Sequence, residues 1–280
     1  MIRRIGRALL LLAVLVAVVL AVAFPTDEVA RWVVARATPQ GGASLTFRSA
    51  RLRPTGIHLE GAALRRSDGS ALLEAPWVRL RPSWLALLGE RRGRPWSLGA
   101  GLCTGTVDLE LDADGADQQL EVTWDRLDLG TCLPELVPQL ELSGFGTGEA
   151  SLRIPSSDPL TGSGVFDLSK AVWEVDAPSI GPVTVRADDA TLRWGLDPKQ
   201  LTVERFSLVG PDVEIEMDGN VRLNRTNLGD GRLDLNADVV LVPGGDPVFQ
   251  RLLSAFPPDD DGTRRLRITG SLDAPQVQPQ

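Results

Sequence analysis

Few side chains in this sequence could carry out catalysis. The 280 residues include one histidine, His58, and no tyrosine. Two-residue alternation from Ile57 to Glu60 places His58 beside Glu60 on the polar face of a strand, which is typical of a surface histidine and not of a catalytic base. The sequence contains no nucleophile elbow and no phosphate-binding loop. We therefore expect a non-enzymatic protein with no catalytic residues.

Three consecutive aspartates could offer oxygen ligands to a calcium ion. Asp259, Asp260 and Asp261 precede Gly262, but the segment lacks the spacing and the distal glutamate of a known calcium loop. A solvated loop is the favoured interpretation. A second acidic pair, Asp188-Asp189, is expected to mark a turn or a bulge. We predict no metal site and no cofactor.

The chain has two cysteines, Cys103 and Cys132. In an oxidising compartment they could form a disulfide that closes a loop of about 30 residues, which is worth roughly 3 to 4 kcal/mol on the chain-entropy estimate. Two unpaired buried thiols are the alternative. A zinc site is disfavoured because no second cysteine lies near either one and only one histidine is present.

The N-terminal segment predicts the compartment. Arginines at positions 3, 4 and 7 precede an apolar run over residues 8–24, which as a helix would span roughly 25 Å, close to the ~30 Å hydrocarbon core. We expect a single transmembrane anchor in the inner membrane, with residues 1–7 in the cytoplasm and residues 25–40 as a membrane-proximal helix. Cleavage after the small residues at 21–23 is the alternative. Either interpretation places residues 41–280 in the periplasm.

Charge is distributed unevenly along the chain. Residues 29–100 contain 12 Arg and 4 acidic residues, whereas residues 101–280 contain 14 Lys and Arg and 31 acidic residues. The acidic part argues against nucleic-acid binding. Basic side chains near the anchor could contact anionic headgroups at about 1 kcal/mol each, or could simply occupy solvated strand positions. The candidates are Arg31, Arg36, Arg51 and Arg53.

Apolar and acidic residues alternate strictly in several segments, most clearly over residues 107–112, 213–218 and 233–239. In a strand this alternation produces one apolar face and one charged face. The apolar positions are candidates for the lining of a groove. They are Val107, Leu109, Leu111, Val213, Ile215, Met217, Leu233, Leu235 and Val239.

Turn-forming residues separate the alternating segments and define the expected strands. We predict strands over residues 44–53, 56–65, 72–80, 104–112, 119–124, 141–154, 164–173, 183–194, 201–209, 213–223, 231–242 and 265–272. Short helices are predicted over residues 84–88, 133–137 and 246–256. The expected fold class is mainly β, a curved and largely antiparallel sheet of groove-like or taco-like form within residues 41–280.

An antiparallel sheet with one apolar face must cover that face with helices, with a second sheet, by curling, or with a ligand. Helix-period segments are too few here to supply a helical cover, so curling or a ligand remains. A groove open to lipid should carry small residues along its midline, whereas a closed core should contain large interdigitating residues. Both outcomes stay open at the level of sequence.

The pattern of apolar positions and glycines resembles that of a known group. The segments concerned read GAALRRSDGSALL at residues 61–73, WVRLRP at residues 77–82 and TGSLDAPQV at residues 269–277. Together with the single N-terminal span, they are similar to the AsmA-like/TamB-like group of inner-membrane-anchored periplasmic proteins. Length and the cysteine pair resemble the type II secretion system protein N (GspN) family within it.

This resemblance implies a curved β-groove, a periplasmic location and no catalytic residues. It favours a non-enzymatic assembly or scaffold role in type II protein secretion, with other secretion components as partners. The alternative is an AsmA-like protein that binds or transfers lipid, with phospholipid held on the apolar face of the sheet. Exposed edge strands could bind partners by strand addition, and the proline-rich segment at residues 275–280 is expected to blunt one edge.

Overall fold

The computed structural model describes residues 43–53, 56–66, 71–82, 96–114, 117–131, 142–155, 159–177, 181–223, 231–272 and 274–280. Most of these residues lie in antiparallel strands, so the fold is mainly β with few helices, as the sequence predicts. The chain divides into two compact units, Met1–Pro82 and Ser83–Gln280, called here the N-terminal unit and the C-terminal unit. The predicted anchor at residues 8–24, the flanking residues 1–7 and 25–40, and the predicted helices at 84–88 and 133–137 lie outside the described residues.

None of the helices within the described ranges has the length and apolar character needed to span a bilayer.

Four strands form the N-terminal unit around β3. The strands are β1 (Ala43–Thr46), β2 (Ser49–Arg53), β3 (Gly56–Arg66) and β4 (Ala71–Pro82). One side of β3 pairs first with β2 and then with β1, while the other side pairs with β4. Gly61, at φ +61°, lies where β3 changes from one partner to the other. This left-handed conformation is one that glycine adopts at no steric cost.

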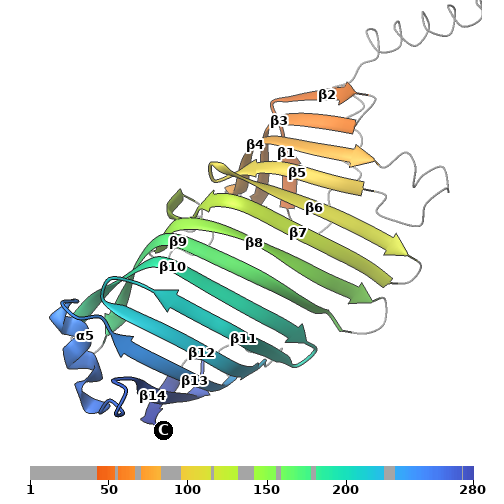
Figure 1. Cartoon of the computed structure of the whole chain (residues 1–280). Helices are drawn as coiled ribbons and strands as arrows, with labels where there is room; N and C mark the ends of the chain where they lie inside the picture. Colours follow the sequence, from red (N-terminus) through yellow and green to blue (C-terminus); the bar gives the residue numbers. More distant parts are fainter. Residues whose placement is uncertain are drawn as a thin grey trace, which may run out of the picture. The chain divides into compact units, whose positions relative to one another are not determined.

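A single antiparallel meander forms the C-terminal unit, in which each described strand pairs with the next along the chain (Figure 1). Its strands are β5 (Trp96–Leu102), β6 (Gly105–Asp114), β7 (Asp117–Asp128), β8 (Leu142–Pro155), β9 (Thr161–Ala177), β10 (Gly181–Asp197), β11 (Gln200–Val209), β12 (Val213–Arg222), β13 (Arg232–Leu241), β14 (Arg264–Ser271) and β15 (Ala274–Pro279). Helix α5 (Pro247–Leu252) and the 3-10 helix η2 (Leu253–Ala255) lie between β13 and β14.

Strands β8, β9 and β10 are the longest described strands of the meander, and they bend near one end (Figure 1). The register of β8 against β9 shifts at Gly144, at φ +132°, opposite Lys170, at φ +52°. A Cβ added to Gly144 would lie 3.0 Å from the Cα of Ala171, which is 1 % exposed. Small residues therefore allow the strands to approach closely at the bend.

Most of the predicted strands are confirmed, and the predicted helix at 246–256 corresponds to α5 and η2. Alternation in the sequence does not predict β5 and β15. Strand β5 has glycine and serine at its polar positions instead of charged residues, and β15 contains two prolines, which are uncommon in strands. The predicted single strand at 44–53 is wrong, because β1 and β2 are separate.

Two tryptophans lie over glycines of neighbouring strands. A Cβ added to Gly148 would lie 2.7 Å from the ring of Trp124, and one added to Gly164 would lie 2.7 Å from the ring of Trp194. The register pairs these residues directly across β7–β8 and β9–β10. A large ring thus fills the space that the missing side chain leaves, a device that stabilises glycine within a sheet.

Replacing Gly148 by alanine should therefore destabilise the protein. The added Cβ would also lie 2.2 Å from the backbone oxygen of Val165, and overpacking of this kind costs about 1 to 3 kcal/mol. The matched control is Gly195→Ala in β10, whose added Cβ would meet only the side chain of Glu204, at 3.5 Å. Denaturant unfolding should show a lower free energy of unfolding for G148A alone. Equal stability of the two variants would contradict this packing.

Candidate functional site

Apolar side chains line one face of the C-terminal unit from β6 to β14. Directly opposed residues of paired antiparallel strands lie on the same face, so the register identifies each row of neighbours. The first row is Val107, Trp124, Gly148, Phe166, Leu192, Phe206, Met217, Ala237 and Leu266. The second row is Leu109, Val122, Ala150, Gly164, Trp194, Val203, Gly219, Leu235 and Ile268. The third row is Leu111, Leu120, Leu152, Gly162, Leu196, Leu201, Val221, Leu233 and Gly270. We call this surface the inner face, and the opposite surface of the sheet the outer face.

All nine residues predicted to line a groove lie on the inner face. Six belong to the three rows, and the other three lie on β12 and β13 further along the same face. Their burial differs. Val213, Leu235 and Val239 are buried at 2 %, 7 % and 5 % exposure, so they belong to closed core. The half-buried residues are Val107, Leu109, Leu111, Ile215, Met217 and Leu233.

The inner face is closed at the end that carries α5. Phe249 of α5 belongs to the same buried cluster as Val213 and Leu208, and α5 lies at one end of the strands in Figure 1. Asp246 caps the helix by accepting from the backbone N–H of Val248 at 2.8 Å. Buried Asp212 accepts at Oδ1 from the backbone N–H of Asp246 at 2.8 Å, which ties the start of α5 to the β11–β12 turn. These polar contacts fix the helix over the closed end.

Away from this end, the inner-face residues of β6 to β9 are mostly half-buried. The two middle strands of this region contribute small residues, among them Gly148 and Ala150 from β8 and Gly162 and Gly164 from β9. Helices α5 and η2 pack against the buried cluster at the other end. The rings of Trp124 and Trp194 lie over two of these glycines, so the small residues do not by themselves indicate an open groove.

Aromatic side chains form part of this half-buried surface, which the sequence analysis did not single out. The rings of Trp124 and Phe166 lie with centroids 6.0 Å apart. The indole Nε1 of Trp124 is buried without a hydrogen-bond partner. An unpaired donor in an apolar environment is costly, at about 1 to 3 kcal/mol. The signal that could have identified these residues was the spacing of each tryptophan from the glycines on the next strand.

The single histidine lies in the N-terminal unit. His58 Nε2 is 3.9 Å from Glu60 Oε1, and Glu60 also interacts with Arg51 at 3.6 Å and accepts from Ser49 Oγ at 3.0 Å. The prediction that His58 lies beside Glu60 is therefore confirmed. The Nδ1 atom of His58 is buried without a hydrogen-bond partner. Of the other basic residues predicted to lie near the membrane, Arg53 lies in β2, while Arg31 and Arg36 lie outside the described residues.

Cys103 is disulfide-bonded. The chain has one other cysteine, Cys132, which lies outside the described residues. Cys103 and Thr104 form the two-residue β5–β6 turn, with φ values of +49° and +64°. These values are typical of a type I′ hairpin turn, which is usually made by asparagine and glycine. A strained turn is thus located at the point where the disulfide is attached.

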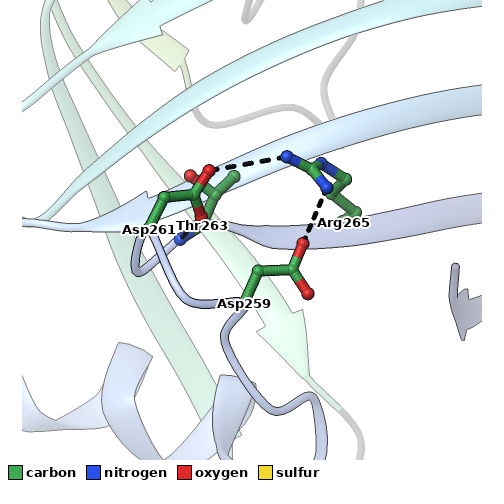
Figure 2. Close-up of polar contacts among 4 residues, drawn as sticks. All are labelled: Asp259, Asp261, Thr263 and Arg265. Atoms are coloured by element: carbon green, nitrogen blue, oxygen red, sulfur yellow. Dashed lines mark hydrogen bonds and ion pairs between the residues drawn. The ribbon is translucent and has the colours of Figure 1, made fainter.

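The acidic segment before β14 forms a loop organised by Arg265 (Figure 2). Arg265 contacts Asp259 at 2.9 Å and Asp261 at 3.4 Å. The backbone N–H of Thr263 donates to Asp261 Oδ1 at 2.9 Å, and this hydrogen bond lowers the pKa of the Asp261 carboxyl from its ordinary value. The carboxylates contact an arginine and backbone of their own loop. Within the described ranges no group of three metal-binding side chains occurs.

Strand β15 has no partner on its far side among the described strands. The backbone N–H of Gln280 donates to the carbonyl of Arg265 at 3.0 Å, so alternate residues of β15 direct their N–H groups toward β14. Pro275 and Pro279 stand at the positions whose N–H would point away from the sheet. On the free edge of β15, the backbone N–H of Val277 is therefore the one outward-pointing donor within the strand. The two prolines disfavour addition of another strand at this edge.

Comparisons of the chain with protein-family models, with curated proteins and with solved structures find no match. The likeness to the AsmA-like group therefore rests on the sequence pattern.

Restoring the backbone N–H groups at positions 275 and 279 should allow the free edge of β15 to pair with an edge strand of another molecule. The double variant Pro275→Thr/Pro279→Thr is expected to shift the full chain toward larger species in light scattering, because the two new N–H groups can pair with another edge. The control is Gln276→Thr/Gln278→Thr, which changes positions whose N–H groups already face β14. Unchanged mass for the proline variant would contradict the proposed blocking.

Proposed function

We propose that the protein binds phospholipid through the half-buried part of its inner face. The observation that carries this proposal is the continuity of the three apolar rows together with their incomplete burial from β6 to β9. Large exposed apolar surfaces of soluble domains are usually sites of interaction. On this proposal the curved sheet is a groove, and an acyl chain lies along the half-buried apolar rows.

Both the geometry and the chemistry of this surface suit an acyl chain. An extended, featureless hydrocarbon needs an extended apolar track and no hydrogen-bonding groups, and the three rows offer no charged or hydroxyl side chain. Burial of hydrocarbon contributes roughly 0.8 kcal/mol per CH₂, so even part of one chain would bind usefully. The expected membrane anchor at residues 8–24 would hold the groove near its source of lipid.

The chemistry also favours a binding role over catalysis. Glu60 is the carboxylate next to the chain's single histidine, and both lie in the N-terminal unit, whereas the three apolar rows belong to the C-terminal unit. The inner face itself carries no nucleophile, acid or base in its three rows. Lipid would thus be held and passed on unchanged, in the periplasm beside the inner membrane.

A role in assembly of the type II secretion system is the second candidate. Four large apolar side chains interrupt the polar outer face, each between 37 % and 47 % exposed. Val209 and Val240 flank Glu214 in one register row, and Phe145 and Val172 lie on β8 and β9. Exposed apolar residues among charged ones are suited to a transient protein partner, which here would be another secretion component.

The lipid proposal predicts that retained phospholipid depends on the inner face. Full-length protein purified in a mild detergent should carry phospholipid in native mass spectrometry. Val122→Asn places an amide in the second apolar row and should lower the retained lipid roughly fivefold or more, because an unpaired amide is costly in an apolar site. Thr123→Asn, at the adjacent outer-face position of β7, is the matched control and should retain lipid.

Absence of lipid from the unmodified protein, or equal loss in both variants, would refute lipid binding. If Val209→Asp/Val240→Asp then abolished capture of secretion components, the assembly role would replace it.

A further inference from the structure

Two arginines on the outer face lie directly opposite each other. Arg222 ends β12 and Arg232 begins β13, and the register places them opposite one another. Both are exposed, and neither forms an ion pair within the described part of the chain. Opposed like charges on neighbouring strands destabilise a sheet.

The other outer-face arginines described in β11 to β14 are neutralised. Arg205 contacts Glu216 at 2.8 Å, Arg265 contacts Asp259 at 2.9 Å, and Arg267 contacts Asp234 at 2.9 Å. The last pair matters most, because Asp234 is the nearest acidic residue to Arg232 along β13. Asp234 already forms an ion pair with Arg267. Arg222 and Arg232 therefore leave a local excess of two positive charges in a chain whose net charge is -8.

The two arginines line a hollow with further hydrogen-bonding groups. Its volume is about 920 Å³, and its lining includes Gln200, Thr269 and Ser271. Gln200 lies opposite Arg222, and Ser271 lies opposite Arg232, so four strands contribute one polar row. The amide of Gln200 donates to Asn220 Oδ1 at 2.6 Å, which holds that wall in place. The hollow is at the opposite end of β12 and β13 from α5.

We propose that this hollow, called here the arginine hollow, binds a phosphate group. Two guanidinium groups from adjacent strands can each donate a pair of parallel hydrogen bonds to phosphate oxygens, which is the geometry that arginine provides and lysine does not. The hydroxyl groups of Thr269 and Ser271, both in β14, supply uncharged hydrogen-bond donors. The site lies on the face opposite the apolar rows and does not depend on lipid in the groove. The phosphate belongs either to a phospholipid headgroup or to a free phosphate ion.

The test compares two double variants of the full chain in a nonionic detergent. Arg222→Gln/Arg232→Gln removes the unpaired arginines, whereas Arg205→Gln/Arg265→Gln removes two paired ones and the same charge. Binding is measured by titration calorimetry at low ionic strength with inorganic phosphate and with dihexanoylphosphatidylglycerol. The first variant should bind about tenfold or more weakly, since charged hydrogen bonds are lost, while the second should change little.

Stability separates a binding role from a structural one. Because R222Q/R232Q removes a repulsion, its melting temperature without ligand should equal or exceed that of the unmodified protein, and added phosphate should raise the melting temperature of the unmodified protein only. Binding of the lipid alone assigns a headgroup, and binding of phosphate alone assigns the free ion. Binding of neither probe, or an equal loss in both double variants, would overturn the proposal.

Discussion

The register of the paired strands is the constraint on which the C-terminal unit depends. From β6 to β14 each strand pairing sets residues of the three apolar rows against one another on the inner face. A slip of one residue in any pair would transfer a whole strand's apolar set to the outer face. The hydrophobic effect therefore selects one register at each pairing, and the succession of these choices produces one continuous surface.

Where alternation is interrupted, a bulge restores the register. Glu204 and Arg205 are adjacent polar residues in β11, and the register shifts at this point so that Val203 and Phe206, three positions apart, both remain on the inner face. The same solution occurs at Asp125-Arg126 in β7, where Arg126 adopts φ +51°. Each bulge also increases local twist, which contributes to the bending of the sheet.

The sequence predicted the strands well because alternation is a local signal that the sheet enforces residue by residue. The doublet Asp188-Asp189, predicted to mark a turn or a bulge, instead lies within β10, and the register against β9 does not shift there although the ladder skips Asp188. Burial along the face was not predictable from alternation. Val213 and Val107 belong to identical patterns, yet only Val213 is closed by α5, because burial depends on the tertiary position of a helix. The arginine hollow was equally invisible, since Arg222 and Arg232 are ten residues apart and meet only through the register.

Cross-linking from adjacent positions of one strand tests most directly whether the inner face is an open lipid-binding surface. A photoreactive phenylalanine analogue placed at Phe166 lies in the first apolar row, and the same analogue at Val165 lies on the outer face opposite Arg193. Irradiation of the full chain in membranes should give phospholipid adducts from position 166 and few from position 165. Equal labelling from both positions, or none from position 166, would contradict an open apolar face.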